Sequence, residues 1–333
     1  MKIGINGFGR IGRLGFRAGL DHTEYTIVQI NELGGIAETA AHLLEFDTVH
    51  GRWDRNITHD ESSISVEGQK ITVTHNKRIE DTDWSSCDIV IEATGVYKTV
   101  AQLEAYFAQG VKKVVVAAPV KDDEALNIVI GCNDELYDPL VHRIVTAASC
   151  TTNCIAPAIK VVHEKIGIER GTITTLHNLT NTQVIVDAPH SDLRRARSSV
   201  NSMIPTTTGS ATAITMIYPE LKGKLNGHAV RIPLLNASLT DCVFELKREV
   251  TAEEVNSLLK EAAEGELKGI LGYEEKPLVS ADYTDDTRSG IIDAPSTMVV
   301  DGTMLKLFVW YDNEVGYANR LMDLVQQVAK SIS

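Results

Sequence analysis

Apolar and polar positions alternate along the first 150 residues with two different periods. Residues 2–6 form a short apolar run that predicts a buried strand. Ile11, Leu14 and Ala18 then recur at helical spacing, and residues 25–31 form a second apolar run. A strand, a helix and a strand in this order predict a βαβ unit.

The same alternation continues to residue 149. Further strands are predicted at 87–92, 113–117, 126–130 and 143–146, with a hairpin insertion at 63–73 around Glu67-Gly68 and a helix ending near residue 109. Continuous apolar runs of this kind are typical of a parallel sheet with both faces covered. We therefore expect an α/β domain of the doubly wound type over 1–149.

The pattern changes after residue 150. Strands are predicted at 171–178, 229–233 and 238–247, a helix from the capping box Thr251-Glu254 through Leu267, and a hairpin at 297–300 and 305–310. Period-two alternation and irregular interleaving indicate an α+β substrate domain with a mixed or antiparallel sheet over 150–312. A final helix at 313–333 is expected to complete the first domain.

Composition narrows the classes of partner. The 333 residues carry a net charge of −13, which disfavours nucleic acid or an anionic membrane as the main partner. The five cysteines are odd in number and lack Cys-x2-Cys spacing, so neither a disulfide framework nor a metal site is expected. We find no signal region and no run that would span a membrane, which makes the cytoplasm the default location.

The first strand leads into a glycine-rich turn, Gly7-Phe8-Gly9-Arg10-Ile11-Gly12, and Glu32 lies at the end of the second strand. In this context the turn predicts a Rossmann-type dinucleotide site, although glycines also recur by chance in tight turns. Gly7 permits the turn, Gly9 lets the backbone approach a pyrophosphate, and Gly12 permits close helix packing. Glu32 would bind a ribose hydroxyl and repel a 2′-phosphate, which favours NAD over NADP.

Cys150 lies between a predicted strand and a predicted helix. A thiol at a helix N-terminus meets free N–H groups and the positive end of the helix dipole, and both favour the thiolate. The local sequence leaves open that Cys150 is an inert packed residue, as most cysteines are. Cys154 is expected to be such a residue.

Candidate partners for a reactive Cys150 lie further along the chain. His177 ends a predicted strand and could serve as a base, although taken alone a solvated or hydrogen-bonded histidine fits better. The cluster at 192–197, which contains Arg194, Arg195 and Arg197, lies near threonines and Gly209. This combination is typical of phosphate binding, but a salt-bridged surface or a subunit interface fits Arg194 and Arg197 equally well. Arg231 stands alone in an apolar strand and therefore needs a partner, such as an anionic substrate. A dinucleotide domain followed by a nucleophilic cysteine suggests aldehyde oxidation through a thioester.

Four stretches resemble the phosphorylating glyceraldehyde-3-phosphate dehydrogenase family, and the likeness extends over nearly the whole chain: residues 6–13, 148–154, 192–197 and 310–314. The resemblance implies a homotetramer that uses NAD, with Cys150 as nucleophile and His177 as base. It implies cofactor contacts at Gly7, Phe8, Gly9, Arg10, Ile11, Gly12, Glu32, Thr94, Gly95 and Asn313. It also implies that the substrate's 3-phosphate is held by Thr180, Thr182, Arg195 and Arg231, and inorganic phosphate by Ser149, Thr151, Thr208 and Gly209.

Several positions depart from the family's usual pattern. Glu32 stands where Asp is usual, which keeps the charge but adds a methylene at the ribose contact. Ala188 precedes Pro189 where NAD-specific bacterial members resemble Leu-Pro, and together with residues 33–35 this leaves use of NADP open. Residues 146–150 and 179–183 are similar to a subgroup associated with arsenate resistance, in which arsenate replaces phosphate and gives 1-arseno-3-phosphoglycerate.

Three other functions stay open on the sequence. Erythrose-4-phosphate dehydrogenase shares the cysteine motif but looks different around the phosphate positions that Thr180, Thr182, Thr208 and Gly209 occupy here. A non-enzymatic nucleotide-binding redox sensor would use Cys150 only as a target of oxidants. A Cys–His hydrolase is disfavoured by the dinucleotide domain upstream.

Overall fold

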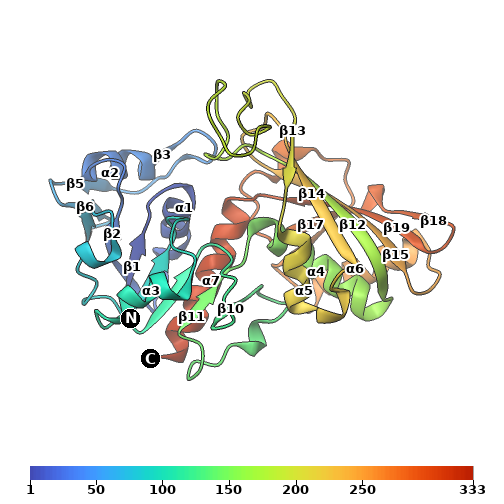
Figure 1. Ribbon diagram of the computed structural model, residues 1–333, viewed down its shortest axis with the longest axis horizontal. Coiled ribbons are helices and arrows are strands. Elements are labelled where there is room, and N and C mark those ends of the chain that lie inside the picture. The colour runs from blue at the N-terminus through green and yellow to red at the C-terminus, as the bar shows by residue number, and fades with distance from the viewer. Residues whose placement is uncertain (333) are drawn as a thin grey trace. The chain divides into compact units, whose positions relative to one another are not determined.

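The computed structural model describes residues 1–332 and divides the chain into two compact units. Unit 1 comprises Met1–Ser149 and Ala318–Ser333, and unit 2 comprises Cys150–Tyr317. Each unit is built on its own sheet, as Figure 1 shows. Within residues 1–332, no helix combines the length and the apolar character that a membrane crossing requires.

The sheet of unit 1 has nine strands in the order β10-β11-β9-β8-β1-β2-β7-β6-β5. The strands from β10 to β7 pair in parallel, and β5, β6 and β7 form an antiparallel edge. The strand bounds are β1 Lys2–Asn6, β2 Thr26–Asn31, β5 Ile57–His59, β6 Ser63–Val66, β7 Gln69–Thr74, β8 Ile89–Glu92, β9 Lys113–Val116, β10 Ala125–Asn127 and β11 Ile144–Thr146, with a separate pair β3 Phe46–Asp47 and β4 Gly51–Arg52. The predicted Rossmann-type sheet is confirmed.

The helices of unit 1 are stabilised by close packing and, in one case, by an N-terminal cap. They are α1 Arg10–Gly19, α2 Ala37–Glu45, α3 Val100–Phe107, the greater part of α7 Val315–Ser331, and the short 3₁₀ helices η1 Ile79–Asp81 and η2 Asp134–Leu136. Thr99 and Gln102 form a capping box that starts α3. Helix α7 packs closely on α1, because a Cβ at Gly19 would lie 2.4 Å from the Met322 Cε.

One predicted strand of unit 1 is wrong in length. The apolar run at 126–130 suggested a strand, but β10 ends at Asn127. The Asn133 side chain accepts a hydrogen bond from the Val129 N–H (2.8 Å) and donates one to the Asn127 carbonyl (3.0 Å). These bonds turn the chain, and the apolar side chains of 128–130 do not reveal them.

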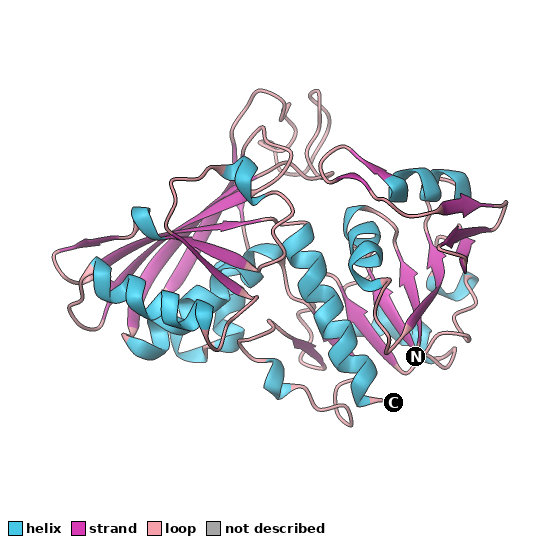
Figure 2. Cartoon of the chain, turned by 180° about the vertical axis from the view of Figure 1, so that it is seen from behind, coloured by secondary structure: helices cyan, strands magenta, loops and turns pink. Residues whose placement is uncertain are grey.

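Unit 2 has an eight-stranded mixed sheet in the order β13-β14-β12-β15-β19-β17-β16, with β18 paired to β19. Its strands are β12 Ile168–His177, β13 Ile204–Thr207, β14 Leu225–Arg231, β15 Ser238–Leu246, β16 Leu271–Glu274, β17 Gly290–Asp293, β18 Met298–Val300 and β19 Met304–Tyr311. Its helices are α4 Cys150–Lys165, α5 Ser210–Ile217 and α6 Ala252–Glu264, with 3₁₀ helices η3 Pro219–Leu221, η4 Ser280–Tyr283 and η5 Ala294–Ser296. Helix α4 lies against one face of this sheet, with α6 beside it (Figure 2).

The start of α6 shows half of the predicted capping box. The Thr251 hydroxyl accepts a hydrogen bond from the Glu254 N–H, as expected, but the Glu254 carboxylate pairs with Arg248 at 2.8 Å. The helix ends at Glu264, before the predicted Leu267. The pattern also missed β13, β16, β17 and α5, each of eight residues or fewer and embedded in irregular chain.

Candidate active site

Cys150 is the first residue of α4 and is half-buried. The chain reaches it through a tight turn in which buried Ala148 has a left-handed backbone, with φ of 50°. The Ala148 N–H donates to the Thr146 hydroxyl at 3.0 Å, which fixes the turn. A left-handed alanine costs about 1 kcal/mol or more, so the surrounding structure holds this turn in place.

His177 ends β12 and brings its Nε2 atom to 3.6 Å from the Cys150 Sγ. Its ring lies edge-on to the Tyr311 ring, with centroids 6.0 Å apart. The Tyr311 hydroxyl is hydrogen-bonded to the hydroxyls of Thr151 (2.9 Å) and Thr175 (2.8 Å). The structure thus brings together two residues that are 27 positions apart, and it does so through buried packing.

The other ring nitrogen of His177 has two neighbours. Nδ1 lies 2.8 Å from the Asn178 carbonyl oxygen and 2.7 Å from the Arg231 Nη1. Arg231 stands beside His177 because the two are register partners in the parallel pair β12–β14. The Arg231 Nε is buried and has no hydrogen-bond partner among the described residues. The buried arginine that the sequence singled out therefore lies at the catalytic histidine candidate.

Burial dominates the electrostatics of this cluster. It raises the pKa of the Cys150 thiol, although the Arg231 charge and hydrogen bonds from Thr151 oppose the rise. Burial, followed by the Arg231 charge, lowers the pKa of His177 to about 3. The resting pair is therefore a thiol and a neutral imidazole. Desolvation of the sulfur therefore opposes the helix N-terminus, and the expectation from the sequence took only the helix end into account.

Two of the candidate residues for the 3-phosphate lie at neighbouring strands, Arg195 beside β13 and Arg231 at the end of β14. The hydroxyls of Thr180 and Thr182 lie 2.9 Å apart. The Arg195 Nε donates to the Thr206 hydroxyl on β13 at 2.9 Å, and β13 pairs with the strand that carries Arg231. Two arginines and several hydroxyls on neighbouring segments can hold a dianion.

The second candidate anion position lies at the start of α5. Gly209 is the N-cap residue, and the Thr208 hydroxyl accepts a hydrogen bond from the Ser210 N–H at 3.2 Å. Ser149 immediately precedes α4, and the Thr151 hydroxyl is engaged with Tyr311.

The remaining two arginines of the cluster at 192–197 lie at the surface. Arg197 makes an exposed ion pair with Asp187 at 2.8 Å, and Arg194 is exposed. For these two, the surface interpretation fits better than the phosphate interpretation.

The glycine turn of unit 1 fits a pyrophosphate. Gly7 has φ of 93°, and a Cβ at Gly12 would lie 2.1 Å from the Gly7 carbonyl oxygen. A Cβ at Gly9, in contrast, would meet nothing within 4 Å. Helix α1 has no side-chain cap, so its first N–H groups are suited to an anion.

Glu32 is already fixed at the end of β2. Its carboxylate accepts hydrogen bonds from the Phe8 N–H (2.6 Å) and the Gly34 N–H (2.8 Å), so it lies next to the glycine turn. Arg10 is ion-paired with the buried Asp47 carboxylate. Thr94 donates to the Glu92 carboxylate through its N–H (2.9 Å), and Gly95 follows with φ of 70°.

A buried polar network beneath the glycine turn was missed by the sequence reasoning. The Asn6 amide donates to Glu92 at 3.0 Å, and the Tyr106 hydroxyl donates to the same carboxylate at 2.6 Å. Asn31 donates to the Asn6 side-chain oxygen at 2.8 Å. Burial raises the pKa of Glu92, while hydrogen bonds from Thr94, Tyr106 and Asn6 oppose the rise. Polar residues at the ends of apolar strands were the available signal.

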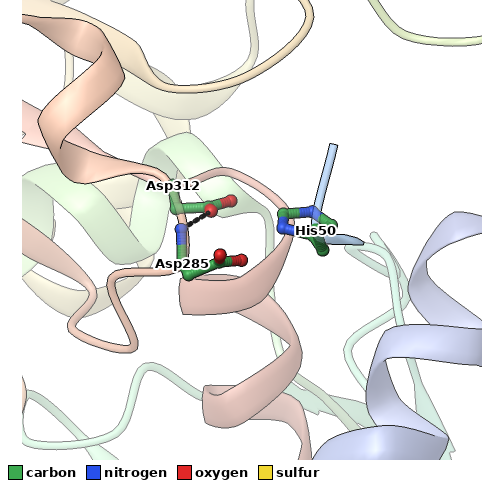
Figure 3. Close-up of side chains that lie close together, drawn as sticks. All are labelled: His50, Asp285 and Asp312. Carbon is green, nitrogen blue, oxygen red and sulfur yellow. Dashed lines mark hydrogen bonds between the residues drawn. The ribbon is translucent and has the colours of Figure 1, made fainter. Parts of the chain in front are cut away.

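Asn313 is held by residues that the sequence did not single out. Its side-chain oxygen lies 3.2 Å from the Ser238 hydroxyl, which can donate to it. The neighbouring Asp312 is buried and accepts hydrogen bonds from the N–H groups of Asp285 (2.9 Å, Figure 3) and Glu314 (2.8 Å). With Ser238 on the oxygen, the Asn313 NH₂ group is the part of the amide suited to a carbonyl ligand.

Comparison with known proteins agrees with this arrangement. Residues 1–100 match the family model for the NAD binding domain of glyceraldehyde 3-phosphate dehydrogenase, and residues 149–313 match that for its C-terminal domain. The chain is 58% identical to glyceraldehyde-3-phosphate dehydrogenase 3 of Nostoc sp. over 100% of this chain and 99% of that protein. It is 53% identical to glyceraldehyde-3-phosphate dehydrogenase 1 of Bacillus cereus (97% of each chain) and 51% identical to the Geobacillus stearothermophilus enzyme (99% and 98%). The chain therefore belongs to the glyceraldehyde-3-phosphate dehydrogenase family and carries that family's NAD-binding domain.

Proposed function

We propose that this chain oxidises glyceraldehyde 3-phosphate with NAD and inorganic phosphate to 1,3-bisphosphoglycerate, through a thioester on Cys150. The observation that carries the proposal is the cluster of Cys150, His177 and Arg231, with Sγ and Nε2 3.6 Å apart. The reaction needs a nucleophile for the aldehyde carbon, a base for the thiol proton and a cation for the substrate's phosphate, and these three groups lie together here.

The first step is attack by the Cys150 sulfur on the aldehyde carbon. The thiol proton passes to the His177 Nε2, and the new C–S bond turns the aldehyde oxygen into an alkoxide that the Nε2–H then stabilises. A neutral imidazole with a low pKa can accept this proton only transiently, so it is well placed to return it to the oxygen. The product is a thiohemiacetal on Cys150.

Bound NAD would supply the hydride acceptor that the oxidation of the thiohemiacetal carbon needs. Loss of hydride from carbon and of the hydroxyl proton to His177 leaves a thioester on Cys150. Phosphate oxygen then attacks the thioester carbon, the C–S bond breaks, and the acyl phosphate departs while the sulfur regains a proton.

Binding roles follow from the two anion positions. The 3-phosphate is assigned to Thr180, Thr182, Arg195 and Arg231, and the attacking phosphate to Ser149, Thr151, Thr208 and Gly209. The NAD contacts are assigned to the glycine turn, Glu32, Thr94, Gly95 and Asn313. The open space beside Gly9 and the uncapped start of α1 support the cofactor assignment.

A homotetramer in the cytoplasm completes the proposal. Large apolar side chains are mostly exposed in the loop between β12 and β13: Ile185, Val186, Leu193 and Met203. Burying them against other copies of the chain would remove an apolar surface that water otherwise contacts. Sedimentation of the purified protein measures the assembly.

One assay tests the reaction and separates its rivals. We expect NADH formation from glyceraldehyde 3-phosphate that depends on phosphate or arsenate. No NADH with either anion would refute the dehydrogenase and favour a redox sensor. Comparable turnover of erythrose 4-phosphate would overturn the substrate assignment, and a kcat/KM for arsenate far above that for phosphate would assign the chain to arsenate detoxification. The same assay with NADP measures cofactor strictness.

A further inference from the structure

The resting arrangement around His177 contains a conflict between two hydrogen bonds. A guanidinium only donates hydrogen bonds. The Arg231 Nη1, 2.7 Å from the His177 Nδ1, therefore requires a lone pair on Nδ1. The Asn178 carbonyl, 2.8 Å from the same Nδ1, only accepts and requires a proton there. One neutral nitrogen satisfies only one of these neighbours.

The choice decides what His177 can do to Cys150. If Nδ1 accepts from Arg231, the single proton of the neutral imidazole resides on Nε2, which faces the sulfur at 3.6 Å. An Nε2–H can donate a hydrogen bond to sulfur but cannot take the thiol proton. If Nδ1–H donates to the Asn178 carbonyl, Nε2 has a free lone pair and can act as the base.

Binding of an anion favours a position of the Arg231 guanidinium away from the His177 Nδ1. Its buried Nε lacks a hydrogen-bond partner among residues 1–332, and its Nη1 also donates to the Asn178 carbonyl at 3.1 Å. Arg195, whose Nε donates to Thr206 on β13, adds a second positive charge near Arg231, which makes an anion between the two guanidinium groups favourable. A phosphate monoester offers several acceptor oxygens to the guanidinium fork.

We infer that Arg231 holds the resting His177 in the Nε2–H form, which cannot deprotonate Cys150, and that a phosphate monoester bound by Arg231 releases the imidazole to its base form. The imidazole then loses the Nε2 proton to water and gains one on Nδ1, so its charge is unchanged. Arg231 is in this respect a positioning residue that acts through His177. The inference rests on the proposed function, since it makes the base available only when the phosphorylated substrate is present.

The direct readout is the protonated nitrogen of His177, observed by ¹⁵N NMR of histidine-labelled protein and assigned with His177→Asn. We expect the proton on Nε2 in the protein without ligands and on Nδ1 after addition of glycerol 3-phosphate, a monoester without an aldehyde. Arg231→Met should show the Nδ1–H form with or without the monoester. A resting Nδ1–H form in the wild type, or no change with the monoester, would overturn the inference.

Alkylation of Cys150 by neutral iodoacetamide, without NAD or aldehyde, gives a second readout. We expect glycerol 3-phosphate to accelerate alkylation of the wild type by about tenfold and to leave the rate of Arg231→Met unchanged. Arg197→Met, which removes an exposed arginine paired with Asp187, should respond like the wild type. If Arg231 acted on Cys150 only through its charge, the monoester would slow alkylation, because a bound anion disfavours the thiolate. If the tautomer stays fixed while NADH still forms, only this inference fails, and the proposed function stands.

Discussion

The glycine turn of unit 1 and the cysteine cluster of unit 2 are built in different ways. The turn is a contiguous stretch whose shape is set by backbone contacts, with a Gly12 Cβ only 2.1 Å from the Gly7 carbonyl. The cluster is assembled by strand register, with His177 and Arg231 54 positions apart but paired across β12 and β14. The local site leaves no room for an added atom at Gly12, whereas the register-built site depends on the identity of each side chain.

Cys150→Ser should give the largest effect, because the proposed mechanism forms every covalent intermediate on the Cys150 sulfur. We expect NADH formation to fall by at least about 10³-fold, while NAD binding stays unchanged. Cys154→Ala is the matched control, since Cys154 lies one turn further along α4 and is fully buried. Activity of Cys150→Ser near the wild-type level would rule out the thioester.

His177→Asn tests the base of the cysteine cluster in unit 2. We expect kcat to fall by about 10²-fold or more, because the base is lost while the substrate contacts remain. Steady-state kinetics measure the loss of the base as a fall in kcat, and NAD titration checks that cofactor binding is unchanged. His228→Asn changes an exposed histidine of the neighbouring strand and should leave kcat unaltered. Equal losses in the two variants would point to disruption of the sheet instead.

Gly9→Ala and Gly12→Ala separate ligand space from backbone packing in unit 1. The Gly9 Cβ meets no protein atom, so we expect an unchanged melting temperature and a weakening of NAD binding by about tenfold. The Gly12 Cβ overlaps the Gly7 carbonyl, so Gly12→Ala should lose about 2 kcal/mol of stability as well. Calorimetry and NAD titration of both variants measure these effects. Unchanged NAD affinity in Gly9→Ala would contradict the placement of the pyrophosphate.

Asp47→Asn should give the smallest effect and one that depends on pH. Burial alone would raise the pKa of Asp47, but Arg10 and the N–H groups of His50 and Val49 outweigh it and lower the pKa to about 2. A depressed folded-state pKa stabilises the protein above the unfolded value near 4, and this contribution is lost as pH falls toward 2. Urea unfolding at pH 5, 4 and 3 should show a loss of about 1–2 kcal/mol for the variant at pH 5 that shrinks toward pH 3. A loss independent of pH would exclude the ionised carboxylate as its source.

The two regions also differ in how much of them could be predicted. Periodicity predicts the strands that flank the glycine turn, and the spacing of Gly7, Gly9 and Gly12 predicts its ligand, because all the determinants are local. The contact between His177 and Arg231 depends on the parallel pairing of β12 with β14, which no local pattern encodes. The desolvation of the Cys150 thiol could not be predicted for a similar reason, since the helix end is visible in the sequence but the packing that buries the sulfur is not.

The most direct test of the account is the mass of the protein after reaction without phosphate or arsenate. With glyceraldehyde 3-phosphate and NAD, we predict one NADH per chain and one covalent phosphoglyceroyl group, found on the peptide that contains Cys150. Addition of phosphate should remove the group and restore turnover. Continued NADH formation without any adduct, or an adduct at another residue, would contradict the account.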